Sequence, residues 1–202
     1  AGDNLTVETD AAVDGQYGIS LYTDVGGAID SEGGSVTIAG KLATGSGKAY
    51  IGTSDVADTV TIAATAQFDF GNAAVIGEMN DFVLNTGAGN DSISLTSLTS
   101  SIAHSIDGGA GVDTLIGSKL NDTLTGGAGD TLTGFGGIDT YNITGGTVSV
   151  TDLGLGGAGV LKVSAGATVN ATVTAAWTAT SATQNLGTAN IETKGLAVNL
   201  AL

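Results

Sequence analysis

The chain has 202 residues, among them 34 glycines, no proline, no cysteine and few aromatic residues, and its net charge is −15. With five lysines and no arginine it lacks a basic surface for nucleic acid or anionic membranes, and no apolar stretch is long enough for membrane insertion. So few large side chains exclude an ordinary globular core, whereas short rungs filled by Val, Ile, Leu and Ala can stack into an elongated coil.

Residues 1–76 are predicted to form N-terminal β-rungs. Apolar residues alternate with polar ones in short runs, and turn-forming groups such as 14–15 and 32–34 separate the runs. A helical turn is conceivable only at 73–79. The expected strand residues are Leu5 and Val7, Ile19 and Leu21, Val36 and Ile38, Ala49 and Ile51, Val60 and Ile62, and Phe68 and Phe70.

Residues 77–143 form a second region with a glycine-rich repeat. The lines read GGAGVDTLI from 108, GSKLNDTLT from 117, GGAGDTLT from 126 and GFGGIDTYN from 134. The third line is one residue short, and the fourth has Phe135 where a second glycine is expected. A near match, TGAGNDSIS, begins at 86, and residues 80–83 keep only the end of the pattern. A nine-residue period of this kind indicates a stacked architecture.

The chemistry of one line predicts a cation site. Gly108, Gly109 and Gly111 can adopt backbone angles that are barred to other residues, so their carbonyls can turn toward one point. Asp113 then adds a carboxylate. Ligation by oxygen alone suits calcium before magnesium and well before zinc. The alternative is that these aspartates are solvated turn residues without a metal.

The segment 108–116 resembles in full the nonapeptide of RTX (repeats-in-toxin) proteins, and the other lines resemble it more loosely. The resemblance implies a calcium-binding parallel β-helix or β-roll, in which two nonapeptides make one coil and calcium ions lie between stacked turns. It also implies secretion from a bacterium into a calcium-rich medium. Carried onto this chain, it predicts several Ca²⁺ ions held by Asp81, Gly87, Gly89, Asp91, Gly108, Gly109, Gly111, Asp113, Gly117, Asn121, Asp122, Gly126, Gly127, Gly129, Asp130, Gly134, Gly137 and Asp139.

The spacing of acidic residues predicts which turns are stacked. In the repeat, Asp113 should lie over Asp130 and Asp122 over Asp139, each pair 17 residues apart. Upstream, Asp69, Asp91 and Asp113 are 22 apart, while Asp58, Asp81 and His104 are 23 apart. We interpret this as wider coils of about 22 residues narrowing into coils of about 17.

Residues 144–202 form a C-terminal β-strand region. Gly154 to Gly159 matches GxGxxG, but we reject a dinucleotide site because a strand at 160–163 follows instead of a helix. Alternation over 167–177 predicts a long strand that ends at Trp177, which either caps the apolar stack or exposes its ring to stack on a sugar. Leu196, Val198, Leu200 and Leu202 predict a last strand, and we expect these late strands to pair antiparallel.

The sequence gives little support to catalysis, and we expect that the chain is not an enzyme. His104 is the only histidine, and a catalytic arrangement would need Ser101 or Ser105 and an acid to converge on it. Calcium ligation also accounts for the many carboxylates better than acid-base chemistry does.

These observations predict a calcium-dependent structural module of a secreted bacterial surface protein that assembles into a surface layer or an extracellular fibre. The expected partners are other copies of the chain and a cell-surface glycan, with no nucleic acid and no membrane insertion. Two alternatives are a spacer or ligand-binding domain of a large adhesin and the non-catalytic tail of a secreted enzyme. The chain does not begin with methionine, so we interpret it as a segment or processed piece of a longer protein.

Overall fold

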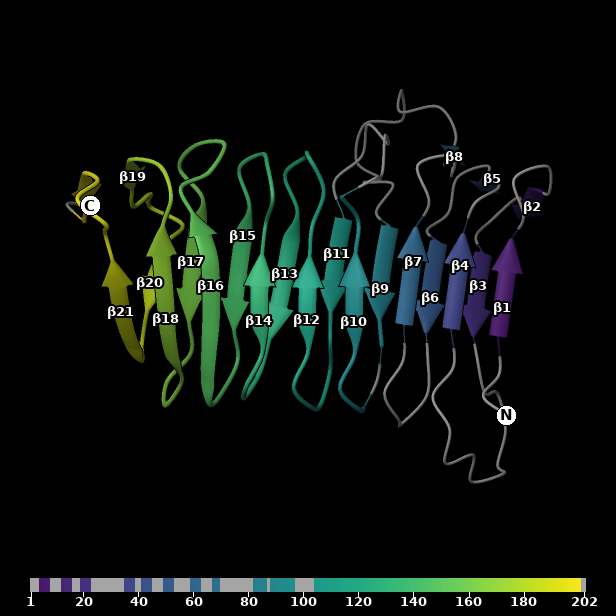
Figure 1. The fold of residues 1–202 in the computed structure, drawn as a ribbon, viewed down its shortest axis with the longest axis horizontal. Helices are drawn as coiled ribbons and strands as arrows, with labels where there is room; N and C mark the ends of the chain where they lie inside the picture. The colour runs from purple at the N-terminus through teal and green to yellow at the C-terminus, as the bar shows by residue number, and fades with distance from the viewer. Residues whose placement is uncertain are drawn as a thin grey trace.

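The protein is an all-β solenoid in which every described strand pairing is parallel (Figure 1). The computed structural model describes residues 82–86, 88–96 and 104–200, together with eight N-terminal strands between residues 4 and 69 whose backbone alone is described. Within these residues every regular element is a strand, and no helix is long and apolar enough to cross a membrane. The predicted parallel β-helix or β-roll is therefore confirmed.

Two long sheets run along the solenoid axis and cross both predicted region boundaries. Sheet A has nine strands, in the order β1 (Asn4–Val7), β4 (Ser35–Ile38), β7 (Thr59–Ile62), β10 (Ser92–Ser94), β12 (Thr114–Ile116), β14 (Thr131–Thr133), β16 (Thr147–Leu153), β18 (Thr168–Val173) and β21 (Thr188–Glu192). Sheet C has eight, in the order β3 (Ile19–Tyr22), β6 (Ala49–Gly52), β9 (Phe82–Asn85), β11 (His104–Asp107), β13 (Thr123–Gly126), β15 (Thr140–Ile143), β17 (Val160–Val163) and β20 (Gln184–Asn185).

A third, shorter face is present near each end of the solenoid. In the N-terminal coils it consists of β2 (Ala12–Gly15), β5 (Lys41–Thr44) and β8 (Gln67–Asp69). In the C-terminal coils it consists of β19 (Trp177–Thr178) and β22 (Val198–Asn199), and in Figure 1 both groups lie above the two long sheets. Over residues 114–163, all of which the structure describes, the strands belong to the two long faces only.

The predicted narrowing of the coils is confirmed, but the upstream spacing was assigned wrongly. Asp69 ends β8 on the third face and pairs with Ala43, so it is not in line with Asp91. Sheet A instead pairs Thr59, which follows Asp58, with Ser92, a step of 33 residues, and sheet C pairs His104 with Phe82, a step of 22. The 33-residue step is longer because the third-face strand β8 lies within it.

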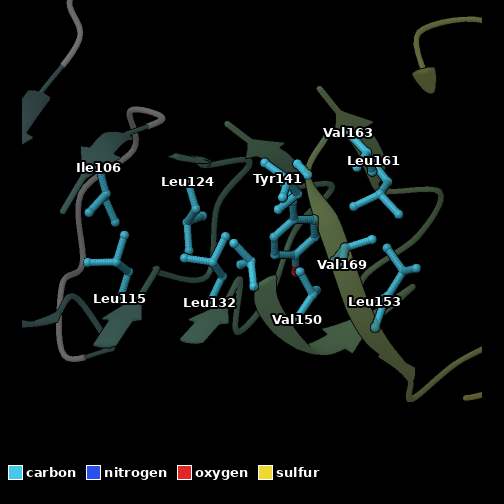
Figure 2. Close-up of a cluster of buried hydrophobic side chains, with 14 of the residues drawn as sticks. Ile106, Leu115, Leu124, Leu132, Tyr141, Val150, Leu153, Leu161, Val163 and Val169 are labelled. Carbon is cyan, nitrogen blue, oxygen red and sulfur yellow. The ribbon is translucent and has the colours of Figure 1, made fainter. Parts of the chain in front are cut away.

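The core is a single file of inward side chains from the two sheets. Strands β10, β12 and β14 of sheet A each contribute one buried residue, and Ile93, Leu115, Leu132 and Val150 lie in register along the sheet. Figure 2 shows Ile106, Leu124 and Tyr141 of sheet C facing Leu115, Leu132 and Val150 from the other side. All these residues are buried, and burying one such side chain contributes about 1.5–3 kcal/mol. The core thereby fixes the register in which the turns stack.

The C-terminal strands are parallel, which corrects the antiparallel pairing expected from the sequence. β21 pairs parallel with β18, and β22 pairs parallel with β19, because the chain continues to wind at about 20 residues per coil. Trp177 is buried and its Nε1–H donates to the Gly159 carbonyl at 2.8 Å. Its ring is therefore not exposed for stacking on a sugar, and Leu200, expected in the last strand, is instead an exposed residue beyond β22.

Candidate metal site

A ladder of buried aspartates, here called the Asp113 ladder (Asp91, Asp113 and Asp130), lies just before strands β10, β12 and β14. The backbone N–H of Asp91 donates to Asp113 Oδ1 at 2.8 Å, and the N–H of Asp113 donates to Asp130 Oδ1 at 2.8 Å. All three residues are buried. The predicted stacking of Asp113 with Asp130 is confirmed, even though the third repeat is one residue short.

A second ladder, the Asp122 ladder (His104, Asp122 and Asp139), lies where strands of sheet C begin. His104 is the first residue of β11, and Asp122 and Asp139 come just before β13 and β15. The N–H of His104 donates to Asp122 Oδ1 at 3.0 Å, and the N–H of Asp122 donates to Asp139 Oδ1 at 2.9 Å. These three residues are buried as well, so the predicted stacking of Asp122 with Asp139 is also confirmed. The aspartates of both ladders point into the solenoid and not into solvent.

The first glycine of each repeat makes room for the carboxylate of the same repeat. A Cβ on Gly108 would collide with the Asp113 carboxylate, and a Cβ on Gly134 would collide with that of Asp139. A Cβ on Gly117 would lie 2.8 Å from Asp122 Oδ2. The repeat needs glycine here because the carboxylate of the same line lies against its Cα, a packing reason that the sequence pattern alone does not reveal.

One oxygen of the Asp113 ladder stands out. Among the described residues, Asp113 Oδ2 is buried and accepts no hydrogen bond, whereas Asp130 Oδ2 accepts the N–H of Gly127 at 2.7 Å. A buried carboxylate oxygen without a donor requires a proton or a cation. Asp113, in the nine-residue repeat, therefore has a carboxylate oxygen available for a ligand. Asp130, in the eight-residue repeat, uses the equivalent oxygen to accept a hydrogen bond within its own turn.

If a cation is bound by Asp113 Oδ2, its other ligands would have to come from the backbone or from water. Within the described part of the chain, no three Asp, Glu, His or Cys side chains form a ready metal cluster. Carbonyls do lie between the stacked turns: a Cβ on Gly111 would meet the Gly89 oxygen, and a Cβ on Gly127 would lie 3.8 Å from the Gly109 oxygen. Carboxylate and carbonyl oxygens are the donors that calcium prefers, so these residues fit such an ion chemically.

Other predicted ligands have different surroundings. Asn121 Oδ1 accepts the N–H of Ile138 at 2.7 Å, so this side chain links two turns by a hydrogen bond. Asn90, which was not predicted, makes the equivalent bond to the N–H of Val112 at 2.9 Å. Asp81 and Gly87 lie outside the described residues.

The structure brings His104, Ser118 and Asp122 together, although the sequence pointed to Ser101 or Ser105. His104 Nδ1 lies 2.8 Å from Asp122 Oδ1, and Ser118 Oγ donates to Asp122 Oδ2 at 2.9 Å. Ser118 Oγ also lies 3.3 Å from the same ring nitrogen of His104. In a catalytic triad the acid and the serine bind opposite ring nitrogens, so this buried cluster has a different arrangement.

Asp152 was missed because it lies beyond the repeat. Its carboxylate accepts the N–H groups of Gly134 and Phe135 at 3.0 and 2.7 Å and the hydroxyl of Tyr141 at 2.8 Å. The available signal was Tyr141, which stands at a core position where the other repeats have leucine or isoleucine. A buried phenol needs a hydrogen-bond partner.

Burial raises the pKa of two of the stacked carboxyls. It raises the pKa of Asp113 to about 6, with further increases from the charges of Asp130 and Asp91 and an opposing effect of the hydrogen bond from Asp91 N–H. It raises the pKa of Asp139 to about 7, where the charges of Asp122 and Asp152 add to it and the bond from Asp122 N–H opposes it. Both groups therefore favour a neutralising proton or cation.

These pKa values predict how the stability of the metal-free protein depends on pH. An unfolded Asp titrates near 3.8, so between that value and about 7 the folded state binds more protons than the unfolded state. The stabilisation from protonated Asp113 and Asp139 is complete below pH 3.8 and is lost as the pH rises through about 6 to 7. Urea unfolding in chelator should give a higher free energy of unfolding at about pH 5 than at about pH 7.5. The difference should shrink in Asp113→Asn/Asp139→Asn, and a higher stability at the upper pH would contradict the assignment.

Phe135 carries backbone strain that glycine would relieve. It has φ of +74°, at the position where the full repeat has Gly109 with φ of +82°. We expect Phe135→Gly to raise the free energy of unfolding by up to about 1 kcal/mol, because a left-handed residue with a Cβ costs about 1–2 kcal/mol. Phe135→Ala is the matched control, since it removes the partly exposed ring but keeps the strain. If the two variants unfold at the same urea concentration, the strain is not relieved.

Comparisons of this chain with models of protein families, with curated proteins and with solved structures found no match.

Proposed function

We propose that this chain is a calcium-dependent structural module of a secreted bacterial surface protein, and that it assembles with copies of itself. The observation that carries the calcium part is the Asp113 ladder, in which buried carboxylates are stacked at successive coils and Asp113 Oδ2 has no donor among the described residues. The resemblance of 108–116 to the RTX nonapeptide supports the same conclusion.

The first ion is assigned to the turns around Asp113. Its ligands would be Asp113 Oδ2 and backbone carbonyls of the neighbouring turns, with water completing the shell. Asp122 is a weaker candidate, because its carboxylate is already occupied by the N–H of His104, the His104 ring and both donors of Ser118. The two ladders therefore differ in role: Asp113 binds the ion, and Asp122 stabilises its turn by accepting hydrogen bonds from His104 and Ser118.

Calcium would also stabilise the fold. Asp91, Asp113 and Asp130 place three carboxyls in successive coils of one buried ladder, and their mutual repulsion opposes folding when they are charged. A divalent ion supplies the missing positive charge. Since the stacked turns exist only in the folded chain, the free energy of binding adds to the free energy of folding.

Asp113→Asn tests this assignment. In chelator the variant should be within about 1 kcal/mol of the wild type, because the amide keeps the acceptor for Asp91 N–H and removes a buried charge. The rise in melting temperature that calcium gives the wild type should be lost or strongly reduced. Lys119→Gln, a change on an exposed turn residue, should respond to calcium as the wild type does.

Two results would overturn the proposal. One is a wild-type melting temperature that calcium leaves unchanged, and the other is an Asp113→Asn variant with a full calcium response. The surface location would be tested separately, by fractionating cells that produce the parent protein and probing the intact surface with an antibody to this chain.

A further inference from the structure

We infer that the outer face of sheet A carries a binding site for an uncharged oligosaccharide, centred on a hollow over the neighbouring strands β16, β18 and β21 (Figure 1). The inference deepens the proposed function, since the presence of such a glycan at a cell surface rests on that proposal. Trp177, the ring that the sequence suggested for stacking on a sugar, is buried. A glycan would therefore have to bind elsewhere on the chain.

The hollow has a volume of about 420 Å³ and opens to solvent. β18 runs through its middle, between β16 and β21. Two amides, three hydroxyls and one carboxylate alternate outward along these strands and line the hollow, from Asn170, Asn190, Ser149, Thr151, Thr172 and Glu192. Together these groups donate and accept hydrogen bonds, as a ligand rich in hydroxyl groups requires.

A β-bulge in β16 borders the hollow. Between the residues that pair with Ala171 and Val173 of β18, β16 has one residue more than β18. Asp152 turns inward there and accepts the Tyr141 hydroxyl at 2.8 Å, while Thr151 beside it stays exposed. Bulges bend a strand and re-aim its side chains, and they are frequent next to active sites. The bulge therefore shapes the face of sheet A at the hollow.

The amides of the hollow keep hydrogen-bonding groups for a ligand. Asn190 Nδ2 donates to Asn170 Oδ1 at 2.9 Å, which orients both exposed side chains. This bond leaves the Nδ2 group of Asn170 and the Oδ1 atom of Asn190 to contact a third group. Glu192 Oε2 accepts only a long bond from Thr172, at 3.4 Å, and a carboxylate can accept two hydroxyls at once. Neighbouring hydroxyls of a sugar ring match this set of donors and acceptors.

A row of uncharged polar residues extends from the hollow along the solenoid axis. Each member pairs with the next one across sheet A, in which neighbouring strands lie about 4.8 Å apart. The row consists of Ser92, Thr114, Thr131, Ser149, Asn170 and Asn190. Because it offers similar chemistry at successive coils, the row suits a ligand that is itself a chain of similar units.

Charge identifies the class of ligand. Among the described strands of sheet A from β10 to β21, Glu192 is the only charged residue on the outer face, although the whole chain has a net charge of −15. An anionic polysaccharide would be repelled, because no basic residue lines the hollow. A peptide cannot add as a strand there, since β18 already pairs with β16 and β21. An uncharged chain of hydroxyl-bearing units fits both conditions.

The test is an NMR titration of the isotopically labelled chain, in calcium, with cellohexaose, maltohexaose and the hexamer of N-acetylglucosamine. At least one of them should shift the backbone amide signals of β16, β18 and β21. We expect a dissociation constant on the order of 1 mM, because no aromatic ring lines the hollow to stack on a sugar. The corresponding disaccharide should bind about tenfold more weakly, since it spans fewer coils.

Asn170→Leu should weaken binding of that hexasaccharide at least about fivefold, because it removes an amide and fills the hollow. Asn142→Leu is the matched control. Asn142 is also a strand residue whose amide contacts a side chain of the neighbouring strand, at 3.5 Å, but it lies in sheet C. Its affinity should stay within about twofold of the wild type, as expected for a distant site. Circular dichroism of both variants checks that they fold.

Three results would overturn the inference: no binding of any of the three hexasaccharides at about 10 mM, equal affinity of the two variants, or tighter binding of the anionic probe hexagalacturonate. Loss of self-association in Asn170→Leu, measured by sedimentation velocity, would also overturn it by assigning the hollow to a second copy. Calcium titration of the same samples separates the two proposals. A chain that binds calcium but no sugar refutes the glycan site alone, and one that binds sugar but no calcium refutes the proposed calcium dependence alone.

Discussion

Gly111→Ala is expected to destabilise the folded chain by roughly 2–5 kcal/mol, which is a large part of the stability of a domain. Gly111 has φ of +147°, a conformation that residues with a Cβ rarely adopt. A Cβ would also collide with the carbonyl of Gly89 in the turn of the preceding coil. The turns of the two coils would have to separate, and the carboxylates stacked beside them would lose their register.

Gly145→Ala is the matched control for this variant. A Cβ at Gly145 would meet nothing within 4 Å, and the residue does not have positive φ. Its free energy of unfolding should stay within about 0.5 kcal/mol of the wild type. Both variants should be unfolded in urea with chelator present, so that calcium binding does not enter the comparison. Equal stability of the two would contradict the close stacking of the turns.

Asp122→Ala is expected to cost roughly 3–5 kcal/mol, in calcium and in chelator alike. The Asp122 carboxylate accepts the N–H groups of His104 and Ser118 at 3.0 and 2.6 Å, and the hydroxyl of Ser118 at 2.9 Å. Its removal leaves these buried donors without an acceptor, and each costs about 1–3 kcal/mol. Urea unfolding under both conditions gives the measurement.

Asp107→Ala serves as the control for Asp122→Ala. Asp107 also accepts a backbone N–H, from Gly109 at 3.0 Å, but this contact is exposed to solvent. Its loss should cost no more than about 1 kcal/mol because water can replace the carboxylate. A contrary result would be an Asp122→Ala variant that loses as little free energy of unfolding as Asp107→Ala in chelator, and much more only in calcium. Asp122 would then be an ion ligand, and the assigned difference between the two ladders would be wrong.

The sequence was sufficient to predict the stacked part of the fold. A nine-residue period places a carboxylate and an inward apolar residue at the same point of every line, and hydrogen bonds between coils then require equal positions to pair. The 17-residue pairs of Asp113 with Asp130 and of Asp122 with Asp139 followed from this. The short third line did not shift the register because its turn absorbs the missing residue, through the bond from Gly127 N–H to Asp130.

The third face could not be predicted in the same way. β2 (AVDG) and β5 (KLAT) have little alternation, and the Asp-Gly and Gly-Ser pairs near them indicate turns. The strand at Phe68 was expected, but without β2 and β5 there was no sign that it belongs to a third face, so Asp69 was wrongly aligned with Asp91. β21 pairs parallel with β18, and β22 pairs parallel with β19. The sequence did not predict this because short strands carry no signal of whether they pair parallel or antiparallel. The direction of these strands is set by the continued winding of the coil.

The candidate site was likewise predicted only in part. Repetition predicted which carboxylates share a ladder, but it could not show that Asp122 is fully hydrogen-bonded while Asp113 Oδ2 is not. That difference depends on Ser118 and His104, two residues at which the repeat is irregular.

Calorimetric titration of calcium into the chelator-treated chain at neutral pH tests the central claim most directly. The account predicts saturable binding with a dissociation constant no weaker than about 1 mM, accompanied by a proton release that grows as the pH is lowered toward about 6, because burial raises the pKa of Asp113 in the metal-free fold to about 6. A titration that shows neither heat of binding nor proton release, on a chain whose circular dichroism is that of a folded β-protein, would contradict it.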